Sequence, residues 1–121
     1  MFLHIKDVLT PEEITFFRQA LGPQAPWIEG ARSAGGQAIH QKNNLQLAQG
    51  SELSAQLQTM VKAALHRNAL FFSAALPRRI YNPLFNNYGD GANFYGNHVD
   101  SAVMHSKADN CWVRSDLSCT L

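Results

Sequence analysis

Helical patterns fill the first part of this chain and strand patterns fill the last part, and this separation limits the fold more than any other feature. The residues Thr10-Pro11-Glu12-Glu13 combine an N-cap, a proline suited to the first helical position and a capping-box glutamate. They predict a helix over about 10–21. A second helix is predicted over about 51–67, because apolar residues recur there at helical spacing: Leu53, Leu57, Met60, Val61, Ala64 and Leu65.

Patterns of extended chain dominate the remainder. Three segments are predicted to be strands: 79–88, 93–100 and 112–121. Shorter segments read as extended chain: 2–9, 27–30 and 42–47. The last strand alternates strictly, which predicts an apolar face with Cys119 as a small core residue. Residues 31–36 read as a mobile loop, and residues 101–110 as a polar loop. Helices followed by strands predict an α+β fold, with two support helices on a mostly antiparallel sheet.

Length and composition exclude several classes of protein. The chain has 121 residues, enough for a single domain over 1–121, and its 45% hydrophobic and 16% charged residues are typical of globular proteins. A net charge of +1 gives no reason to expect a nucleic-acid or membrane partner. No apolar run reaches the length of a transmembrane span, and the N-terminus is charged too early for a signal peptide. We therefore expect a cytoplasmic protein with Cys111 and Cys119 as thiols.

The motif His98-Val99-Asp100 is the candidate metal site. In a strand, alternate side chains share a face, so His98 and Asp100 are expected to stand on one wall. An imidazole and a carboxylate are two of the three ligands of the facial triad that holds non-haem Fe(II). Spacing alone favours a surface turn that carries an ordinary histidine and a solvated aspartate. The glycine-rich residues 89–91 predict a hairpin turn, which would bring Tyr88 back beside the pair.

The late segments 84–91, 98–100 and 114–121 together resemble the bacterial PKHD-type hydroxylases, which are prolyl-4-hydroxylase-like Fe(II)/2-oxoglutarate dioxygenases. The resemblance extends into the helical half, so that it covers nearly the whole chain, at Asn44-Leu-Gln-Leu47, Arg67-Asn-Ala-Leu-Phe71 and Ala74-Ala-Leu-Pro77. It implies a double-stranded β-helix, or jelly-roll barrel, with helices on one side. On this basis residues 1–78 are expected to form mainly helical support, and residues 79–121 the first strands of an incomplete barrel.

The resemblance also implies an activity. Members of this family insert one oxygen atom into a C–H bond, using O₂, Fe(II) and 2-oxoglutarate and releasing succinate and CO₂, with L-ascorbate (vitamin C) keeping the iron reduced. His98 and Asp100 match the first two iron ligands, and no catalytic side chain beyond the ligands is expected. Tyr88 matches a tyrosine of the 2-oxoglutarate pocket, with core packing as its alternative role. Tyr95 and Arg114 match the substrate entrance, and Arg114 has the alternative of pairing with Asp116.

The chain departs from the family pattern at its end. The family's second histidine ligand and the basic residue that binds the distal carboxylate of 2-oxoglutarate lie on later strands, and neither has a match before Leu121. His105 is not expected to replace the histidine. We therefore expect a truncated chain that binds iron weakly, is inactive and self-associates. Two alternatives stay open: a non-catalytic jelly-roll fragment for binding or oligomerisation, and a cupin-like metalloprotein with another chemistry.

Overall fold

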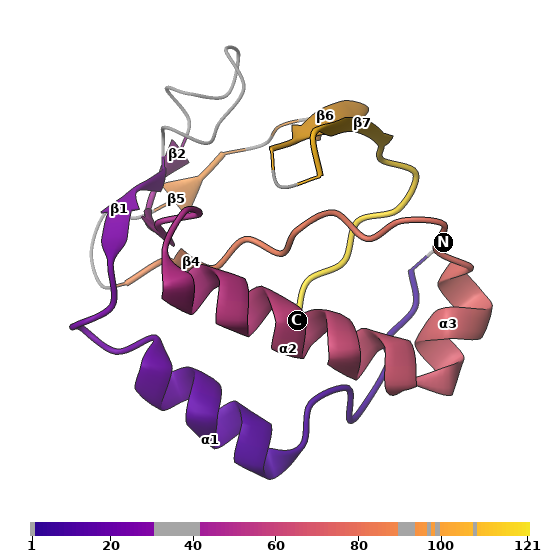
Figure 1. Cartoon of the computed structure of the whole chain (residues 1–121), viewed down its shortest axis with the longest axis horizontal. Coiled ribbons are helices and arrows are strands. Elements are labelled where there is room, and N and C mark those ends of the chain that lie inside the picture. Colours follow the sequence, from indigo (N-terminus) through magenta and orange to yellow (C-terminus); the bar gives the residue numbers. More distant parts are fainter. Residues whose placement is uncertain (1, 31–41, 90–93, 97, 99, 108) are drawn as a thin grey trace. The chain divides into compact units, whose positions relative to one another are not determined.

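The computed structural model describes residues 2–30, 42–89, 94–96, 98, 100–107 and 109–121. The chain divides into two compact units (Figure 1). The first unit comprises Met1–Pro26 and Gln49–Pro83 and contains the helices. The second comprises Trp27–Ala48 and Leu84–Leu121 and contains the strands. The early strands thus group with the late ones.

Helix α1 (Pro11–Ala20) begins with the capping box that the sequence predicts. The Thr10 hydroxyl accepts a hydrogen bond from the Glu13 backbone N–H at 3.1 Å. The Glu13 carboxylate in turn accepts one from the Thr10 backbone N–H at 2.9 Å. These two bonds satisfy N–H groups that have no partner inside the helix. The predicted helix is confirmed, with its end at the C-cap Leu21.

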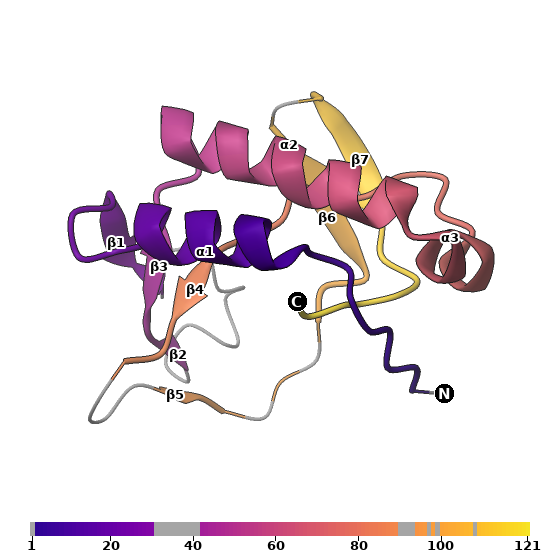
Figure 2. The same ribbon diagram turned by 90° about the horizontal axis from the view of Figure 1, so that it is seen from below.

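Helix α2 (Glu52–Arg67) is the longest element of the first unit. The side chain of its N-cap, Ser51, accepts a hydrogen bond from the Ser54 backbone N–H at 3.1 Å. Helix α1 lies beside α2 and runs in the opposite direction (Figures 1 and 2). The predicted apolar stripe is confirmed as the buried face, and it contributes four residues to the core: Leu57, Val61, Ala64 and Leu65.

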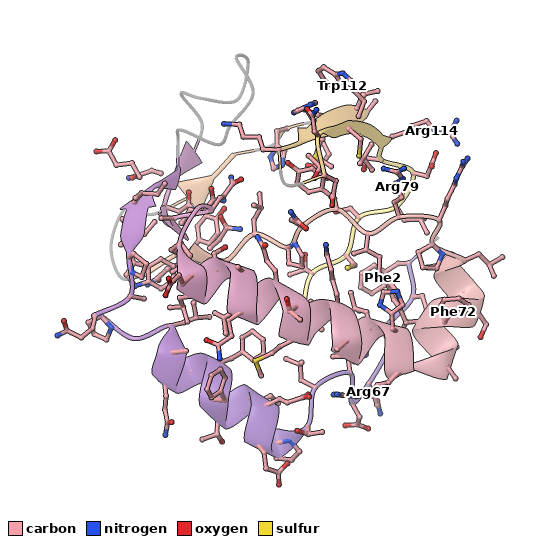
Figure 3. The ribbon with its side chains drawn as sticks, viewed as in Figure 1. Phe2, Arg67, Phe72, Arg79, Trp112 and Arg114 are labelled. Atoms are coloured by element: carbon pink, nitrogen blue, oxygen red, sulfur yellow. The ribbon has the colours of Figure 1, made fainter. Side chains whose placement is uncertain are left out.

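Arg67, labelled in Figure 3, ties the end of α2 to the first turn of α1. Its Nη1 donates to Glu13 Oε1 at 2.7 Å, and its Nη2 bonds to Glu13 Oε2 and to the Val8 carbonyl oxygen. Hydrogen bonds from Arg67 and from the Thr10 backbone lower the pKa of Glu13 from 4.5 to about 2. This side chain therefore fastens the extended arm at 2–9 and α1 to α2.

Helix α3 (Ala69–Ala75) occupies an apolar segment for which the sequence predicts no element. The Asn68 side chain caps it by accepting a hydrogen bond from the Phe71 backbone N–H at 2.9 Å, and the helix ends at Leu76, whose φ is 43°. None of its residues is buried. Asn68 is both the C-cap of α2 and the N-cap of α3, so the second helix can begin directly where the first one ends.

The predicted strand at 79–88 is largely wrong, since only β4 (Asn86–Asn87) forms there. The preceding residues bond to side chains of α2: Gln58 Nε2 donates to the Pro83 carbonyl oxygen at 3.1 Å, and Lys62 donates to Asn82 Oδ1. Pro83 has no N–H to give to a neighbouring strand. The segment is therefore held by a helix and not by a sheet.

A three-stranded antiparallel sheet in the second unit has the order β1–β3–β4, in which β1 is Trp27–Glu29 and β3 is Leu45–Leu47. Directly before β3, β2 (Lys42–Asn43) pairs with β5 (Phe94–Tyr95). The two late strands β4 and β5 thus pair with the 42–47 segment and not with each other, so the predicted hairpin between them is wrong. The predicted turn extends into residues 90–93, which lie outside the described residues, as does the predicted loop at 31–36.

The strand pair β6 (Val103–Ser106) and β7 (Cys111–Arg114) forms an antiparallel hairpin, so the predicted polar loop at 101–110 is wrong. The turn is built by Ser106, whose hydroxyl donates to Asp109 Oδ2 at 2.7 Å, and by Asn110, whose φ is 45°. The segment forms a strand because β7 offers it backbone hydrogen bonds, and an alternating sequence is neither required nor sufficient without such a partner.

The predicted strand 112–121 stops at Arg114, because no partner strand in the described part of the chain continues beyond that residue. One further bond joins the Ser115 N–H to the Ala102 carbonyl oxygen at 2.8 Å, and no element is formed beyond it. Leu117 is 69% exposed and Leu121 61% exposed, and Cys119 is exposed as well. The predicted role of Cys119 as a core residue is therefore wrong, whereas the exposure of Leu117 and Leu121 agrees with the expectation that the last strand of a truncated chain leaves its apolar side chains uncovered.

Helices and small antiparallel sheets together are compatible with the predicted α+β class. The described residues do not close a barrel, so the jelly-roll stays a prediction. Among the helices that the structure describes, none combines the length and the apolar character needed to cross a membrane.

Candidate metal-binding site

The side chains of His98 and Asp100 meet in the second unit. His98 Nε2 lies 3.2 Å from Asp100 Oδ1, and the two side chains are 25% and 63% exposed. Neither residue belongs to a described strand, because β5 ends at Tyr95, so the predicted strand 93–100 is only partly present. The two groups nevertheless reach the same point in space, as the sequence spacing suggests.

The other ring nitrogen of His98 has its own partner. Nδ1 lies 2.7 Å from the Gly96 carbonyl oxygen. A carbonyl oxygen only accepts hydrogen bonds, so Nδ1 is the nitrogen that carries the proton in this bond. Nε2 is then left to face the Asp100 carboxylate, and that arrangement needs a proton or a cation between the two. Histidine ligands of metal ions typically donate their second N–H to a backbone carbonyl in this way.

The residues fit a divalent metal ion on two grounds. Imidazole nitrogen and carboxylate oxygen bind such ions at about 2.0–2.2 Å, so two ligands at a right angle lie about 3 Å apart. The observed separation of 3.2 Å between Nε2 and Oδ1 agrees with this distance. In addition, the Gly96 carbonyl holds the ring of His98 so that its lone pair is directed at the ion site. His98 and Asp100 can therefore hold a metal from two sides.

Within the described part of the chain, no group of three His, Cys, Asp or Glu side chains surrounds a possible metal position. His105 lies in β6 and packs its ring against Trp112 in β7, with the ring centroids 5.0 Å apart in an edge-to-face arrangement. It is thus engaged with an aromatic neighbour on its own hairpin.

The other sequence-predicted site residues lie at exposed or undescribed positions. Tyr88 follows β4 and its side chain is 46% exposed, so it is not packed in a core. Tyr95 pairs through its backbone with Lys42, and its side chain lies outside the described part. Arg114 donates from Nε to Asp116 Oδ1 at 2.9 Å, which is the alternative pairing that the sequence suggests. Figure 3 shows Arg114 and Trp112 extending outward from β7.

A cluster of three side-chain amides, one from β3, one from β4 and one from the residue directly before β3, was not found by sequence reasoning. Asn86 Oδ1 accepts hydrogen bonds from Asn44 Nδ2 and from Gln46 Nε2, each at 3.0 Å. Asn44 and Gln46 are 4% and 1% exposed, which is rare for amides. Asn44 Oδ1 accepts no hydrogen bond from the residues that the structure describes, and it occupies the space that a side chain at Gly30 would need. An unpaired buried acceptor costs about 1–3 kcal/mol. The signal available in the sequence was two amides spaced two residues apart in an extended segment.

Comparison with known proteins gives this site a family context. No family model matches the sequence. Curated relatives do match it, including a PKHD-type hydroxylase of Variovorax paradoxus that is 50% identical over 121 residues, all of this chain and 53% of the relative. A PKHD-type hydroxylase of Aliarcobacter butzleri is 46% identical over the whole chain and 53% of its own length. The PKHD-type hydroxylase YbiX of Escherichia coli is 47% identical over the whole chain and 52% of its own length.

This chain is related to the PKHD-type hydroxylases over its whole length. The resemblance that the sequence shows at separate motifs is thereby confirmed for all 121 residues. The chain spans about half the length of the curated PKHD-type hydroxylases it matches. His98, Asp100 and the amide cluster all lie within the matched region.

Proposed function

We propose that this chain contributes the iron-binding pair His98 and Asp100 to an Fe(II)- and 2-oxoglutarate-dependent dioxygenase. The reaction converts a substrate C–H bond, O₂ and 2-oxoglutarate into a hydroxylated product, succinate and CO₂. The observation that carries the proposal is the 3.2 Å approach of His98 Nε2 to Asp100 Oδ1, with Nδ1 held by the Gly96 carbonyl. The relatives are named hydroxylases, which supports hydroxylation as the reaction class.

Fe(II) supplies the activation of O₂ beside 2-oxoglutarate when it is bound, and L-ascorbate is proposed to keep it reduced. The chain's own residues bind the ion and orient its ligands. His98 and Asp100 hold the ion on two sides, and Gly96 fixes the imidazole ring. With two described protein ligands, we expect the chain to bind iron more weakly than a complete triad and to turn over little.

Three further residues are given roles on the basis of the family resemblance. Tyr88 is proposed to contact 2-oxoglutarate, which agrees with its exposed side chain. Tyr95 and Arg114 are proposed to border the substrate entrance, with Arg114 oriented by Asp116. We place the reaction in the cytoplasm, a reducing compartment that would keep Cys111 and Cys119 from forming disulfides.

The test is an anaerobic titration of the 121-residue chain with Fe(II), followed by 2-oxoglutarate. We expect a visible charge-transfer absorption that requires both components and disappears in Asp100→Ala. Admission of O₂ then allows succinate to be measured. Metal binding without any effect of 2-oxoglutarate would favour a cupin-like protein of another chemistry. Absence of metal binding would favour a non-catalytic role and refute the proposal.

A further inference from the structure

Asn86 is unusual because it is an exposed residue whose side-chain amide is held in one orientation. It lies in β4 directly opposite Gln46 of β3, and the residue as a whole is exposed. Its Oδ1 accepts two hydrogen bonds, from Asn44 Nδ2 and from Gln46 Nε2, each at 3.0 Å. An amide oxygen has two lone pairs, so both are used. The Oδ1 side of Asn86 is therefore directed into the sheet and saturated.

The orientation of this amide is determined by chemistry. A half-turn of the Asn86 amide would place its NH₂ against the NH₂ groups of Asn44 and Gln46, donor against donor. Asn44 is fixed in the same way, because its Nδ2 gives its second hydrogen to the Leu45 carbonyl oxygen at 3.0 Å. The Nδ2 of Asn86 consequently points away from the cluster, and within the described residues no atom accepts a hydrogen bond from it.

The cluster keeps this orientation although it leaves a buried atom without a partner. Asn44 Oδ1 is turned toward Gly30 and accepts no hydrogen bond from the described residues. Buried polar atoms are nearly always paired in folded proteins, and exceptions concentrate at functional positions. Burying the amides of Asn44 and Gln46 in order to orient the exposed amide of Asn86 costs free energy. A surface residue without a further role would not require this arrangement.

We propose that Asn86 is a ligand-recognition residue whose N–H groups, aimed by Asn44 and Gln46, bind a carboxylate or carbonyl oxygen. A neutral, pre-oriented amide suits such planar acceptors because it loses little freedom when the bond forms. The acceptor group has two candidate sources, a carboxylate of the 2-oxo acid or a carbonyl of the molecule that is hydroxylated. The choice between these sources rests on the proposed function, whereas the availability of the donor does not.

The direct test follows the side-chain amide signal of Asn86 by nitrogen-15 NMR of the metal-free 121-residue chain. Three probes are added separately: acetate, N-methylacetamide and 2-oxoglutarate. We expect a saturable shift of the Asn86 amide with at least one probe. A response to acetate and 2-oxoglutarate assigns a carboxylate, and a response to N-methylacetamide assigns an amide carbonyl of a substrate. A shift that does not saturate with any probe would overturn the proposal.

A matched pair of variants separates recognition from charge. Asn86→Asp keeps an oxygen that accepts from Asn44 and Gln46 but replaces the outward NH₂ by a second acceptor. Asn87→Asp adds the same charge one residue along β4, on the opposite face of the strand. Affinity is read from the amide signals of Asn44 and Gln46. We expect at least about a tenfold loss in Asn86→Asp, as for one or two hydrogen bonds, and less than about twofold in Asn87→Asp.

Equal losses of affinity in the two variants would mean that the added negative charge explains the effect. That result would refute recognition by Asn86. Failure of the proposed dioxygenase function is a different result, since it appears as the absence of metal binding or as metal binding on which 2-oxoglutarate has no effect. The two ideas therefore fail independently.

Discussion

His98 Nε2 faces Asp100 Oδ1 across 3.2 Å, and the opposite nitrogen of the same ring is bonded to the backbone at Gly96. Two side chains separated by one residue thus converge on a point that a metal ion can occupy. Both side chains remain accessible to solvent, with Asp100 63% exposed. A metal ion can therefore reach the pair without a rearrangement of the described chain.

We predict that Asp100→Ala and His98→Ala each lower the affinity of the chain for Fe(II) or Co(II) by at least about tenfold, because each removes one of two ligands. The matched control is His105→Ala, which removes a histidine of the same segment that packs against Trp112. We expect that variant to bind with less than about a twofold change. Isothermal titration under anaerobic conditions measures all three. A loss in His105→Ala as large as in Asp100→Ala would mean that His105 is a ligand.

We predict that Gly30→Ala destabilises the chain by about 1–3 kcal/mol, as overpacked sites do. A Cβ at Gly30 would lie 1.8 Å from Asn44 Oδ1 and 2.9 Å from the Asn44 carbonyl oxygen, so Asn44 must move and the amide cluster with it. Gly50→Ala is the control, since no atom lies within 4 Å of a Cβ there. Urea unfolding measures the free energies. Equal stability of the two variants would show that Asn44 yields without cost.

The bond between Glu13 and Arg67 predicts a defined pH dependence of stability. The pKa of Glu13 is lowered from 4.5 to about 2, so the folded state favours the carboxylate. Its contribution to the free energy of unfolding is fully present above pH 4.5 and is lost as the pH falls through 2.

The measurement compares wild type with Glu13→Gln by thermal unfolding between pH 7 and pH 2. Wild type should be the more stable protein near neutrality, and the difference should shrink below about pH 4.5. Glu12→Gln removes a carboxylate from the same turn of α1 and leaves the bond to Arg67 in place. A difference that stays constant over the whole range would contradict the role of the ionised pair.

We predict that the chain self-associates, because Leu117 and Leu121, both in the last segment, are 69% and 61% exposed. Burying a leucine side chain is worth about 1.5–3 kcal/mol, which is enough to drive association at high concentration. The double variant Leu117→Glu and Leu121→Glu should be more monomeric. Thr120→Glu adds a charge at an exposed polar position of the same segment and should have little effect. Sedimentation velocity over a range of concentrations measures the degree of association. A wild-type chain that is monomeric at all concentrations would refute the prediction.

The local elements could be predicted where one short stretch of sequence contains all the information they need. The capping box of Thr10 and Glu13 and the N-cap Ser51 act within four residues, so α1 and α2 follow from the sequence. The apolar stripe of α2 also identified the buried residues Leu57 and Val61, since a helix has one period and one buried face. His98 and Asp100 were found for the same reason, because their spacing is short.

Strands were predicted less well because a strand depends on hydrogen bonds to a partner outside its own run of residues. The residues from Ser115 to Leu121 alternate strictly and form no strand, whereas Val103–Ser106 pairs with Cys111–Arg114 although it reads as a polar loop. Pairing also overrode the predicted hairpin, since β4 and β5 both pair with the segment at 42–47. The amide of Asn86 meets those of Asn44 and Gln46 only through this pairing.

By itself the sequence determined the two capped helices, the buried face of α2, the spacing of the candidate metal-binding pair and the relation to the PKHD-type hydroxylases. These features depend on residues that are near in the chain or on their identities alone. The tertiary structure decided which strands pair, that Cys119 and Leu117 are exposed, and that Asn44, Gln46 and Asn86 share one oxygen. The physical reason for the amide cluster is that the pairing of β3 with β4 joins residues about 40 positions apart, and no local pattern specifies such a partner.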